Sequence, residues 1–348
     1  MHLVLAAVSL AASVAAAPSP APTPAFDTRD YRFASGSVTL AGRLFVPRGG
    51  TKFPLVVLVQ GSDYDDANAS VYWRLIAHTL AKSGIASFSF NKRGVAGSTG
   101  TQTDDFDVQG GDVAAACRFA KSLSGVDRDR VGYYGISQGG WIVPRAIGSC
   151  PGAFTILVSP SGGPPFEQVR YYLKNQYRAA GMNSGEVAAA LRLHDTLAAY
   201  YRTGSGYRAA QALATEAIAS PWYSKLAKVD YRREVPDSGR LPAPAELDIE
   251  NRRNPQTYAF YRSSDTWSVP PTLYESLSAP ILYVYGGRDE NVDVVASMTI
   301  FQKAMRANQN PDVTFHIFES ANHDIEVGER LLPGYREYLA EWILAHAG

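Results

Sequence analysis

The sequence carries no excess of charge of either sign. Its 348 residues include 33 Lys and Arg and 33 Asp and Glu, so the formal net charge is zero. Proteins that are drawn to nucleic acid or to anionic membranes usually have a long-range field from one sign of charge. We therefore expect a neutral or small substrate and no nucleic-acid partner.

Cysteine is scarce as well, with only Cys117 and Cys150, so the chain forms one disulfide at most. An oxidising compartment would favour that bond. Two buried thiols would serve equally well as small apolar side chains, and pairing depends on a distance that the sequence does not supply. Both alternatives stay open.

Long apolar runs are absent after the N-terminus. No later stretch reaches the roughly 18 residues of a transmembrane helix, so we expect no stable membrane insertion. Residues 1–16 are apolar and Ala-rich, and a Pro/Ala-rich linker follows at residues 17–30. This start is typical of a secretory signal peptide, with Val14 and Ala16 spaced for cleavage after Ala16, although it has no early Lys or Arg. We expect an exported protein, periplasmic or extracellular; the alternative is a disordered tail on a cytosolic protein.

Strand-length apolar runs alternate with helical patterns over residues 31–160. A continuous apolar run such as residues 54–60 is typical of a strand buried on both faces. This alternation predicts a mainly parallel, twisted sheet with helices on both faces. The expected strands are residues 38–47, at the sheet edge, 54–60, 85–90, 131–136 and 154–158, and the expected helices are 71–83, 112–123 and 141–147.

The alternation stops over residues 161–270, where residues 185–201 and 207–219 have helical patterns. We expect an inserted helical lid. It holds ten of the 20 tyrosines, which either line a substrate surface or fill the core of a small helical bundle. The α/β core resumes over residues 271–348. Its expected elements are strands at 280–285 and 313–318 and a closing amphipathic helix that uses Leu331, Leu332, Tyr335, Leu339, Trp342 and Ile343.

The strongest chemical motif is Gly135-Ile136-Ser137-Gln138-Gly139-Gly140. It follows a predicted strand and precedes a predicted helix, the setting in which G-x-S-x-G forms a sharp turn with an exposed serine. The glycines permit a strained serine backbone and a close approach of neighbouring elements. We therefore predict Ser137 as a nucleophile.

A serine hydroxyl needs a base to take its proton and a carboxylate to orient the base, in the chain order Ser, Asp or Glu, His. Asp289 follows the strand at 280–285 through the tight turn Gly286-Gly287-Arg288, and His323 follows the strand at 313–318. The sequence thus predicts Asp289 as the acid and His323 as the base.

These two residues have rivals. Glu290 and Asp293 lie close to the same strand end, and any of the three acids is suited to bonding the free N–H groups of a helix N-terminus. His316 falls inside a predicted strand, and His78 and His194 fall inside predicted helices. None of these three histidines is placed to meet the nucleophile.

Acyl transfer also needs two N–H donors directed at the oxyanion. The backbone N–H of Gln138, directly after the nucleophile, is the first candidate. The second is the N–H of Ser62 in Gln60-Gly61-Ser62, at the end of the strand at 54–60. An ordinary glycine turn is the alternative for this segment.

A calcium-binding loop at residues 63–68 is only weakly suggested, because the glycine and the distal glutamate of the known calcium-loop pattern are missing. A solvated loop with a helix cap explains its residues as well. We expect no metal and no cofactor. The residues concerned are Asp63, Asp65, Asp66 and Asn68.

In chain order, these motifs and the turn Asn91-Lys92-Arg93-Gly94-Val95-Ala96-Gly97-Ser98 resemble the landmarks of the α/β-hydrolase superfamily. Within it, the chain is similar to the exported esterase, thioesterase and serine-aminopeptidase-like group. The resemblance covers about residues 38–345 and implies an α/β-hydrolase fold. One departure is Gln60, where the oxyanion loop commonly begins with His. The turn around Arg93 resembles a structural element of the superfamily, and we assign it no catalytic role.

The expected function is that of a serine hydrolase that cleaves a small carboxylic ester or thioester through an acyl-enzyme on Ser137, without a cofactor. One alternative is a serine aminopeptidase-like peptidase, in which lid acids such as Glu246, Asp248 or Glu250 would bind a substrate amine. The other is a catalytically silent binding protein that keeps the fold.

Overall fold

The computed structural model describes residues 26–50, 52–229, 235–236, 238–253 and 260–348. The predicted signal peptide, residues 1–16, and residues 17–25 of the predicted linker lie outside the described residues. The first strand begins at Phe26. Residues 26–30 therefore belong to the sheet, and their assignment to the linker was wrong.

An eight-stranded sheet forms the centre of the molecule, and a two-stranded ribbon of β9 and β10 lies apart from it. The strands are β1 (Phe26–Ser35), β2 (Val38–Pro47), β3 (Phe53–Val59), β4 (Ala86–Phe90), β5 (Val126–Ile136), β6 (Thr155–Val158), β7 (Ile281–Gly286), β8 (Val313–Phe318), β9 (Glu326–Val327) and β10 (Arg330–Leu331). The order in the sheet is β1-β2-β4-β3-β5-β6-β7-β8. β3 to β8 run parallel to one another, whereas β1 and β2 pair antiparallel. The carboxyl ends of the parallel strands therefore meet at one edge, where ligands of open α/β sheets bind.

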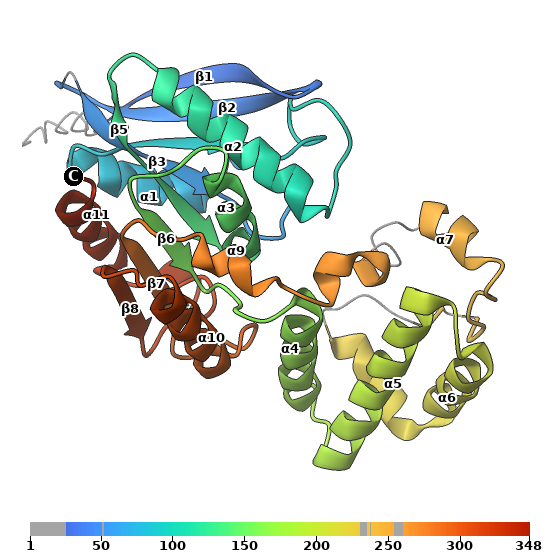
Figure 1. Ribbon diagram of the computed structural model, residues 1–348. Helices are drawn as coiled ribbons and strands as arrows, with labels where there is room; N and C mark the ends of the chain where they lie inside the picture. The colour runs from blue at the N-terminus through green and yellow to red at the C-terminus, as the bar shows by residue number, and fades with distance from the viewer. Residues whose placement is uncertain (1–25, 51, 230–234, 237, 254–259) are drawn as a thin grey trace, which may run out of the picture.

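Helices cover both faces of the sheet. They are α1 (Val71–Lys82), α2 (Phe106–Ser122), α3 (Gly139–Ile147), α9 (Pro271–Glu275), α10 (Val294–Ala307) and α11 (Tyr335–His346). Every residue of β3, β4, β6 and β7 is buried, so side chains on both faces of these strands are shielded from solvent and each face of the sheet needs a cover. α1 and α11 cover one face, and α2, α3, α9 and α10 cover the other (Figure 1). The predicted mainly parallel sheet with helices on both faces is confirmed.

Several predicted elements had the wrong place or extent. β2 is not an edge strand, because β1 pairs along its outer side. The closing helix begins only at Tyr335, so Leu331 and Leu332 lie outside it. Leu331 belongs to β10 instead, and Gly334, with φ of 86°, separates this ribbon from α11.

Helix α2 begins at Phe106 rather than at residue 112. Asp105 starts it by accepting backbone N–H groups of the first turn at 3.0 Å, an ordinary N-cap. Gly110 obscured the pattern, since glycine usually weakens a helix interior. Here it permits contact with α3, because a Cβ on Gly110 would lie 2.7 Å from Arg145 Cβ.

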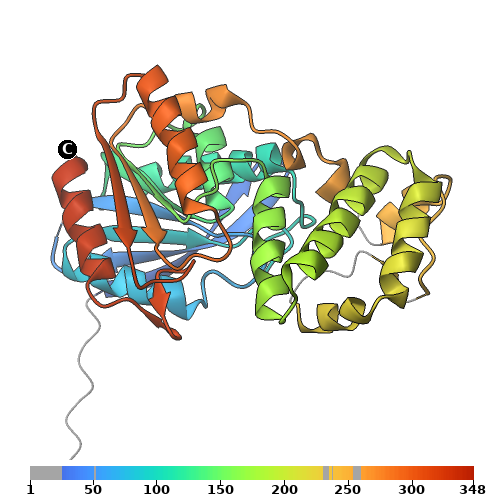
Figure 2. The same ribbon diagram turned by 90° about the horizontal axis from the view of Figure 1, so that it is seen from below.

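A helical insertion connects β6 to β7 and lies beside the core (Figures 1 and 2). Its described elements are α4 (Pro165–Ala179), α5 (Ser184–Thr203), α6 (Tyr207–Ala219), η1 (Pro221–Lys228), α7 (Leu247–Arg253) and η2 (Ser264–Thr266). Tyr200, Tyr201 and Tyr261 are buried in a cluster of its own, with Trp222 and Trp267 packed against them. Most of its described aromatic residues thus fill the insertion's own core.

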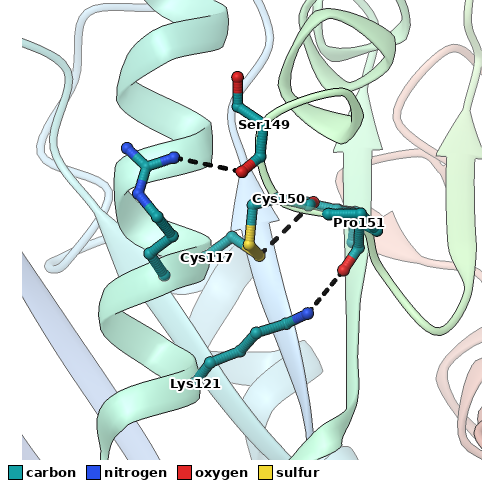
Figure 3. The surroundings of a disulfide bond; sticks show 7 residues. Cys117, Lys121, Ser149, Cys150 and Pro151 are labelled. Atoms are coloured by element: carbon teal, nitrogen blue, oxygen red, sulfur yellow. Dashed lines mark hydrogen bonds between the residues drawn. A yellow bond between two sulfur atoms is a disulfide. The ribbon is translucent and has the colours of Figure 1, made fainter.

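The two cysteines form a disulfide between α2 and the loop after α3 (Figure 3). Their Cα atoms lie 6.3 Å apart. Arg118 and Lys121 of α2 also donate hydrogen bonds to the carbonyls of Ser149 and Pro151 on either side of Cys150. The bond therefore joins two segments that packing and polar contacts already hold together.

Helices of the described ranges all lack the combination of length and apolar character needed to cross a membrane.

Replacing Cys117 and Cys150 by alanine is expected to lower the free energy of unfolding by about 3 kcal/mol. The bond closes a loop with a sequence separation of 33 residues, and its loss raises the entropy of the unfolded chain. Urea unfolding of the variant and of wild-type protein, with and without reductant, measures the difference. Equal midpoints for oxidised wild type and the variant would contradict the prediction, and reduced wild type should match the variant.

Candidate active site

Ser137 lies in the turn between β5 and α3. Its φ of 52° places the backbone in the left-handed region, which costs energy for any residue other than glycine. Two hydrogen bonds hold this conformation: the Ser137 N–H donates to the Val158 carbonyl, and the Gly140 N–H donates to the Ser137 carbonyl, both at 2.8 Å. The serine therefore sits at the carboxyl edge of the sheet and at the N-terminus of α3.

The glycines of the motif are needed because neighbouring elements come close. A Cβ on Gly135 would lie 2.8 Å from Val143 Cγ2, and a Cβ on Gly139 would lie 3.3 Å from the Val59 carbonyl oxygen. Either side chain would push α3 or β3 away from the turn.

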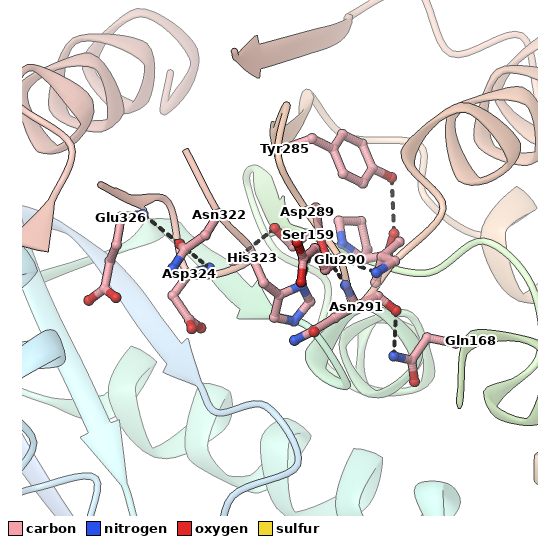
Figure 4. A network of polar contacts seen from close by, with 12 residues as sticks. Ser159, Gln168, Tyr285, Asp289, Glu290, Asn291, Asn322, His323, Asp324 and Glu326 are labelled. Atoms are coloured by element: carbon pink, nitrogen blue, oxygen red, sulfur yellow. Dashed lines mark hydrogen bonds and ion pairs between the residues drawn. The ribbon is translucent and has the colours of Figure 1, made fainter. Parts of the chain in front are cut away.

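Two loops, after β7 and β8, bring Asp289 and His323 together (Figure 4). Asp289 Oδ2 lies 2.9 Å from His323 Nδ1, and Asp289 Oδ1 accepts the N–H groups of Asn291 and Val292 at 2.8 and 2.9 Å. Asp289 thus both contacts the imidazole and closes its own loop. Its rival Asp293 is the N-cap of α10.

The acid loop approaches the histidine loop as closely as backbone atoms permit. A Cβ on Gly286 would lie 2.0 Å from the Asn322 carbonyl oxygen, and a Cβ on Gly287 would lie 2.7 Å from Glu319 Cα. Only glycine fits at either position. The tight turn seen in the sequence is therefore a requirement of loop packing.

Of the described histidines, only His323 lines the cavity that also contains Ser137. His316 lies within β8, His78 within α1 and His194 within α5. The structure therefore places Asp289 in contact with His323, and it places His323 and Ser137 in the lining of the same cavity. Their catalytic roles remain predictions.

Opposing effects act on the pKa of His323. Burial lowers it, whereas the hydrogen bond and charge of Asp289 raise it, with smaller contributions from the charges of Asp324 and Asp63. The acids outweigh burial, so the pKa of His323 lies above its usual value of 6.5. The imidazolium form is therefore stabilised at this position.

Two residues that support His323 were missed by the sequence analysis. Ser159, with φ of 47°, directly follows β6 and donates its hydroxyl to the His323 carbonyl at 2.6 Å. Asn322 Oδ1 accepts the N–H groups of Asp324 and Glu326 at 3.0 and 2.8 Å. In the sequence, Ser159 could have been recognised as a candidate because it directly follows a predicted buried strand.

The predicted oxyanion loop lies beside the nucleophile because β3 and β5 are parallel neighbours. A Cβ on Gly61 would lie 3.3 Å from Ser137 Cβ. Ser62 and Gln138 both line the cavity, and their role as N–H donors remains a prediction. Gln60 donates its side-chain amide to the backbone of its own loop at 3.2 Å, so it holds the loop where a histidine is common.

A cavity of about 770 Å³ lies between the carboxyl edge of the sheet and the helical insertion. Helix α4 and residues 260–266 supply wall residues from the insertion. The lining is aromatic and acidic, and it includes no lysine or arginine from the described part of the chain. Its aromatic residues are Tyr64, Tyr72, Trp73, Phe106, Trp141, Tyr172 and Phe260, and its carboxylates are Asp63, Asp65, Asp104, Asp265, Asp324 and Glu326.

Two other sequence motifs have structural partners. Arg93 makes a two-pronged ion pair with Asp112 at 2.8 and 2.7 Å, and Ser35 donates to the same carboxylate at 2.5 Å. This network ties the turn after β4 to α2 and β1, in keeping with a structural role. Asp66 and Asn68, from the weak calcium pattern, likewise accept hydrogen bonds from neighbouring protein groups.

A mainly parallel sheet covered by helices on both faces, with a strained serine on a strand-turn-helix, defines an α/β-hydrolase. More narrowly, residues 35–323 match the X-Pro dipeptidyl-peptidase (S15) family, and the chain belongs to that family. The expectation of a hydrolase family is confirmed.

Individual relatives are distant. Esterase EstD of Thermotoga maritima is 23% identical over 295 residues, which cover 83% of this chain and 59% of the esterase, so this chain spans less than two thirds of that length. The Pyrococcus furiosus esterase Pf2001 matches with a TM-score of 0.57 at 16% identity, over 93% of this chain and 92% of that one. The α/β-hydrolase GrgF of Penicillium sp. sh18 matches with a TM-score of 0.56 at 17% identity, over 92% and 99%. These two structures support the fold alone.

The raised pKa of His323 predicts how activity depends on pH. If neutral His323 is the base, kcat/KM rises with pH through an apparent pKa above 6.5, because the protonated imidazole accepts no proton. Asp324→Asn removes one charge that raises the pKa of His323, so the midpoint moves to lower pH. Glu216→Gln removes an equal charge from an exposed ion pair that involves α6, and it should leave the midpoint of the pH profile unchanged. pH–rate profiles of the three proteins test this, and an unmoved midpoint in Asp324→Asn contradicts it.

Proposed function

We propose that this protein is a serine hydrolase that cleaves a small carboxylic ester or thioester through an acyl-enzyme on Ser137. The observation that carries the proposal is the 2.9 Å contact between Asp289 and His323 at the cavity that contains the strained serine. The two distant relatives that are named esterases support it, although their names give no substrate for this chain.

The proposed mechanism assigns a role to each side chain. Asp289 bonds Nδ1 of His323, which leaves Nε2 to take the proton of Ser137. The serine oxygen then attacks the acyl carbonyl, and the N–H groups of Ser62 and Gln138 stabilise the oxyanion. His323 returns the proton to the leaving alcohol or thiol, and water activated by the same histidine releases the acid.

The helical insertion is proposed to act as a lid. Four residues of α4 line the cavity above the sheet edge, so a bound acyl group would contact both the core and the insertion. We also propose that the protein is exported, and the Cys117–Cys150 disulfide supports this, since such bonds persist in oxidising compartments.

A second candidate is hydrolysis of substrates that carry a free amine, as the peptidase family of this chain suggests. The lid acids first considered, Glu246, Asp248 and Glu250, are not among the described residues that line the cavity. They pair with Arg240, Arg262 and Arg253, respectively. The six carboxylates of the cavity favour it instead. Asp265 among them is paired with Arg145.

Replacement of Ser137 by alanine tests the proposed nucleophile. Wild-type protein is expected to hydrolyse short 4-nitrophenyl esters and to react with a fluorophosphonate probe, whereas Ser137→Ala loses at least about 10³-fold in kcat and all labelling. Ser161→Ala, a serine after β6 in the same protein, is the control and should label normally. A folded wild-type protein that neither labels nor turns over supports the silent binding protein instead.

Charge in the cavity separates the two enzymatic candidates. If the carboxylates bind an amine, an aminoacyl 4-nitrophenyl ester should exceed its N-acetylated analogue about tenfold in kcat/KM at low salt, and the advantage should shrink as salt screens it. Asp63→Asn should reduce the advantage, while Glu216→Gln should not. Equal rates for both esters at low salt would exclude an amine-binding role and leave the ester hydrolase.

A further inference from the structure

Lys92 is a buried cation next to the proposed oxyanion site. It directly follows Asn91 in the turn after β4, and only 8% of its surface is exposed. Its ammonium donates one hydrogen bond to the Gly61 carbonyl and another to Gln138 Oε1 at 3.0 Å. It also lies over the Tyr64 ring, 4.8 Å from the centroid.

These contacts join the two segments that supply the oxyanion donors. The Gly61 carbonyl belongs to the same peptide group as the Ser62 N–H, and in a planar trans peptide the two bonds point in opposite directions. A cation that holds the carbonyl therefore directs the N–H away from itself and increases its polarity. The second contact holds the side chain of Gln138, whose own N–H is the other proposed donor.

We propose that Lys92 is a positioning residue that holds and polarises the two oxyanion donors of this hydrolase. This inference rests on the proposed function, because it gives the lysine a role only in acyl transfer. A buried charge is costly unless it is paired or well bonded, and the two hydrogen bonds of the Lys92 ammonium to the Gly61 carbonyl and the Gln138 side chain offset this cost. Lys92 acts through Ser62 and Gln138, without contact to the substrate.

The surroundings of Lys92 add a pH dependence. Burial lowers its pKa to about 8, although the charges of Asp63 and Asp104 act in the opposite direction. Arg93 and Asp112 line the same small cavity and are paired with each other. Loss of the proton removes the positive charge behind the Gly61 carbonyl, so activity should fall as the pH rises through about 8.

Lys92→Met tests the proposal, because methionine keeps much of the volume and removes the charge. The expected result is a fall in kcat of about 10- to 100-fold with KM within about threefold, since the donors contact developing negative charge more strongly than a neutral carbonyl. Fluorophosphonate labelling should slow by a similar factor. Lys121→Met is the matched control, because Lys121 also donates to a backbone carbonyl, that of Pro151, but far from the site.

The pH profile separates this role from a purely structural one. The activity of wild-type protein should fall at alkaline pH, and this fall should be absent from the pH profile of Lys92→Met. The fall at acidic pH, which belongs to His323, should be the same in both proteins. A folded Lys92→Met protein with kcat within threefold of wild type, with an unchanged alkaline limb, or with the whole loss in KM overturns the proposal.

Gln138→Met keeps the test decisive if Lys92→Met fails to fold. It leaves the Gln138 N–H in place and removes one acceptor of the ammonium, so it should lower kcat by about 3- to 10-fold and move the alkaline limb to lower pH. An unmoved limb overturns the role of Lys92. A wild-type protein that neither hydrolyses esters nor labels overturns the proposed function as well, whereas an active wild type with an unaffected Lys92→Met protein overturns the role of Lys92 alone.

Discussion

The geometry of the site depends on one buried carboxylate. Asp289 has no exposed side-chain surface and accepts hydrogen bonds from two backbone N–H groups and from His323. A buried charge without partners would cost several kcal/mol, so the carboxylate is stable only while its loop and the histidine loop are both in place. The carboxylate therefore joins the two loops into one packed unit and holds the imidazole in one orientation.

Close backbone packing makes that unit possible. Gly286 and Gly287 lie against the chain between β8 and His323, where any side chain would collide with backbone atoms. Gly61 also lies close to Ser137, since a Cβ on Gly61 would be 3.3 Å from Ser137 Cβ. Four loops from four parallel strands therefore meet within a small volume, and Ser159, from a fifth, fixes the His323 backbone. The sheet order supplies this proximity, since all five strands end at the same edge.

The sequence predicted that Ser137, Asp289 and His323 lie at one sheet edge because each follows a strand, and parallel strands end together. It was insufficient for Lys92 and Ser159, whose roles depend on which carbonyl they reach across the fold. The disulfide could not be decided for the same reason, since it depends on how α2 packs against the loop after α3. The predicted start of α2 was wrong because Gly110 has a low helix propensity, whereas in the structure its close contact with α3 outweighs that propensity. The aromatic residues of the insertion were ambiguous because core and cavity use the same side chains.

Electrostatic effects of opposite sign act on His323 and Lys92. Carboxylates raise the pKa of His323 despite its burial, whereas burial lowers the pKa of Lys92 despite nearby carboxylates. The difference follows from contact: Asp289 bonds the imidazole directly, while the ammonium bonds only the neutral oxygens of Gly61 and Gln138. A neutral base and a charged ammonium are therefore both present only between the two pKa values. The carboxylates that line the cavity raise the lower limit of this pH interval, because each carboxylate near His323 favours the protonated imidazole and so raises its pKa.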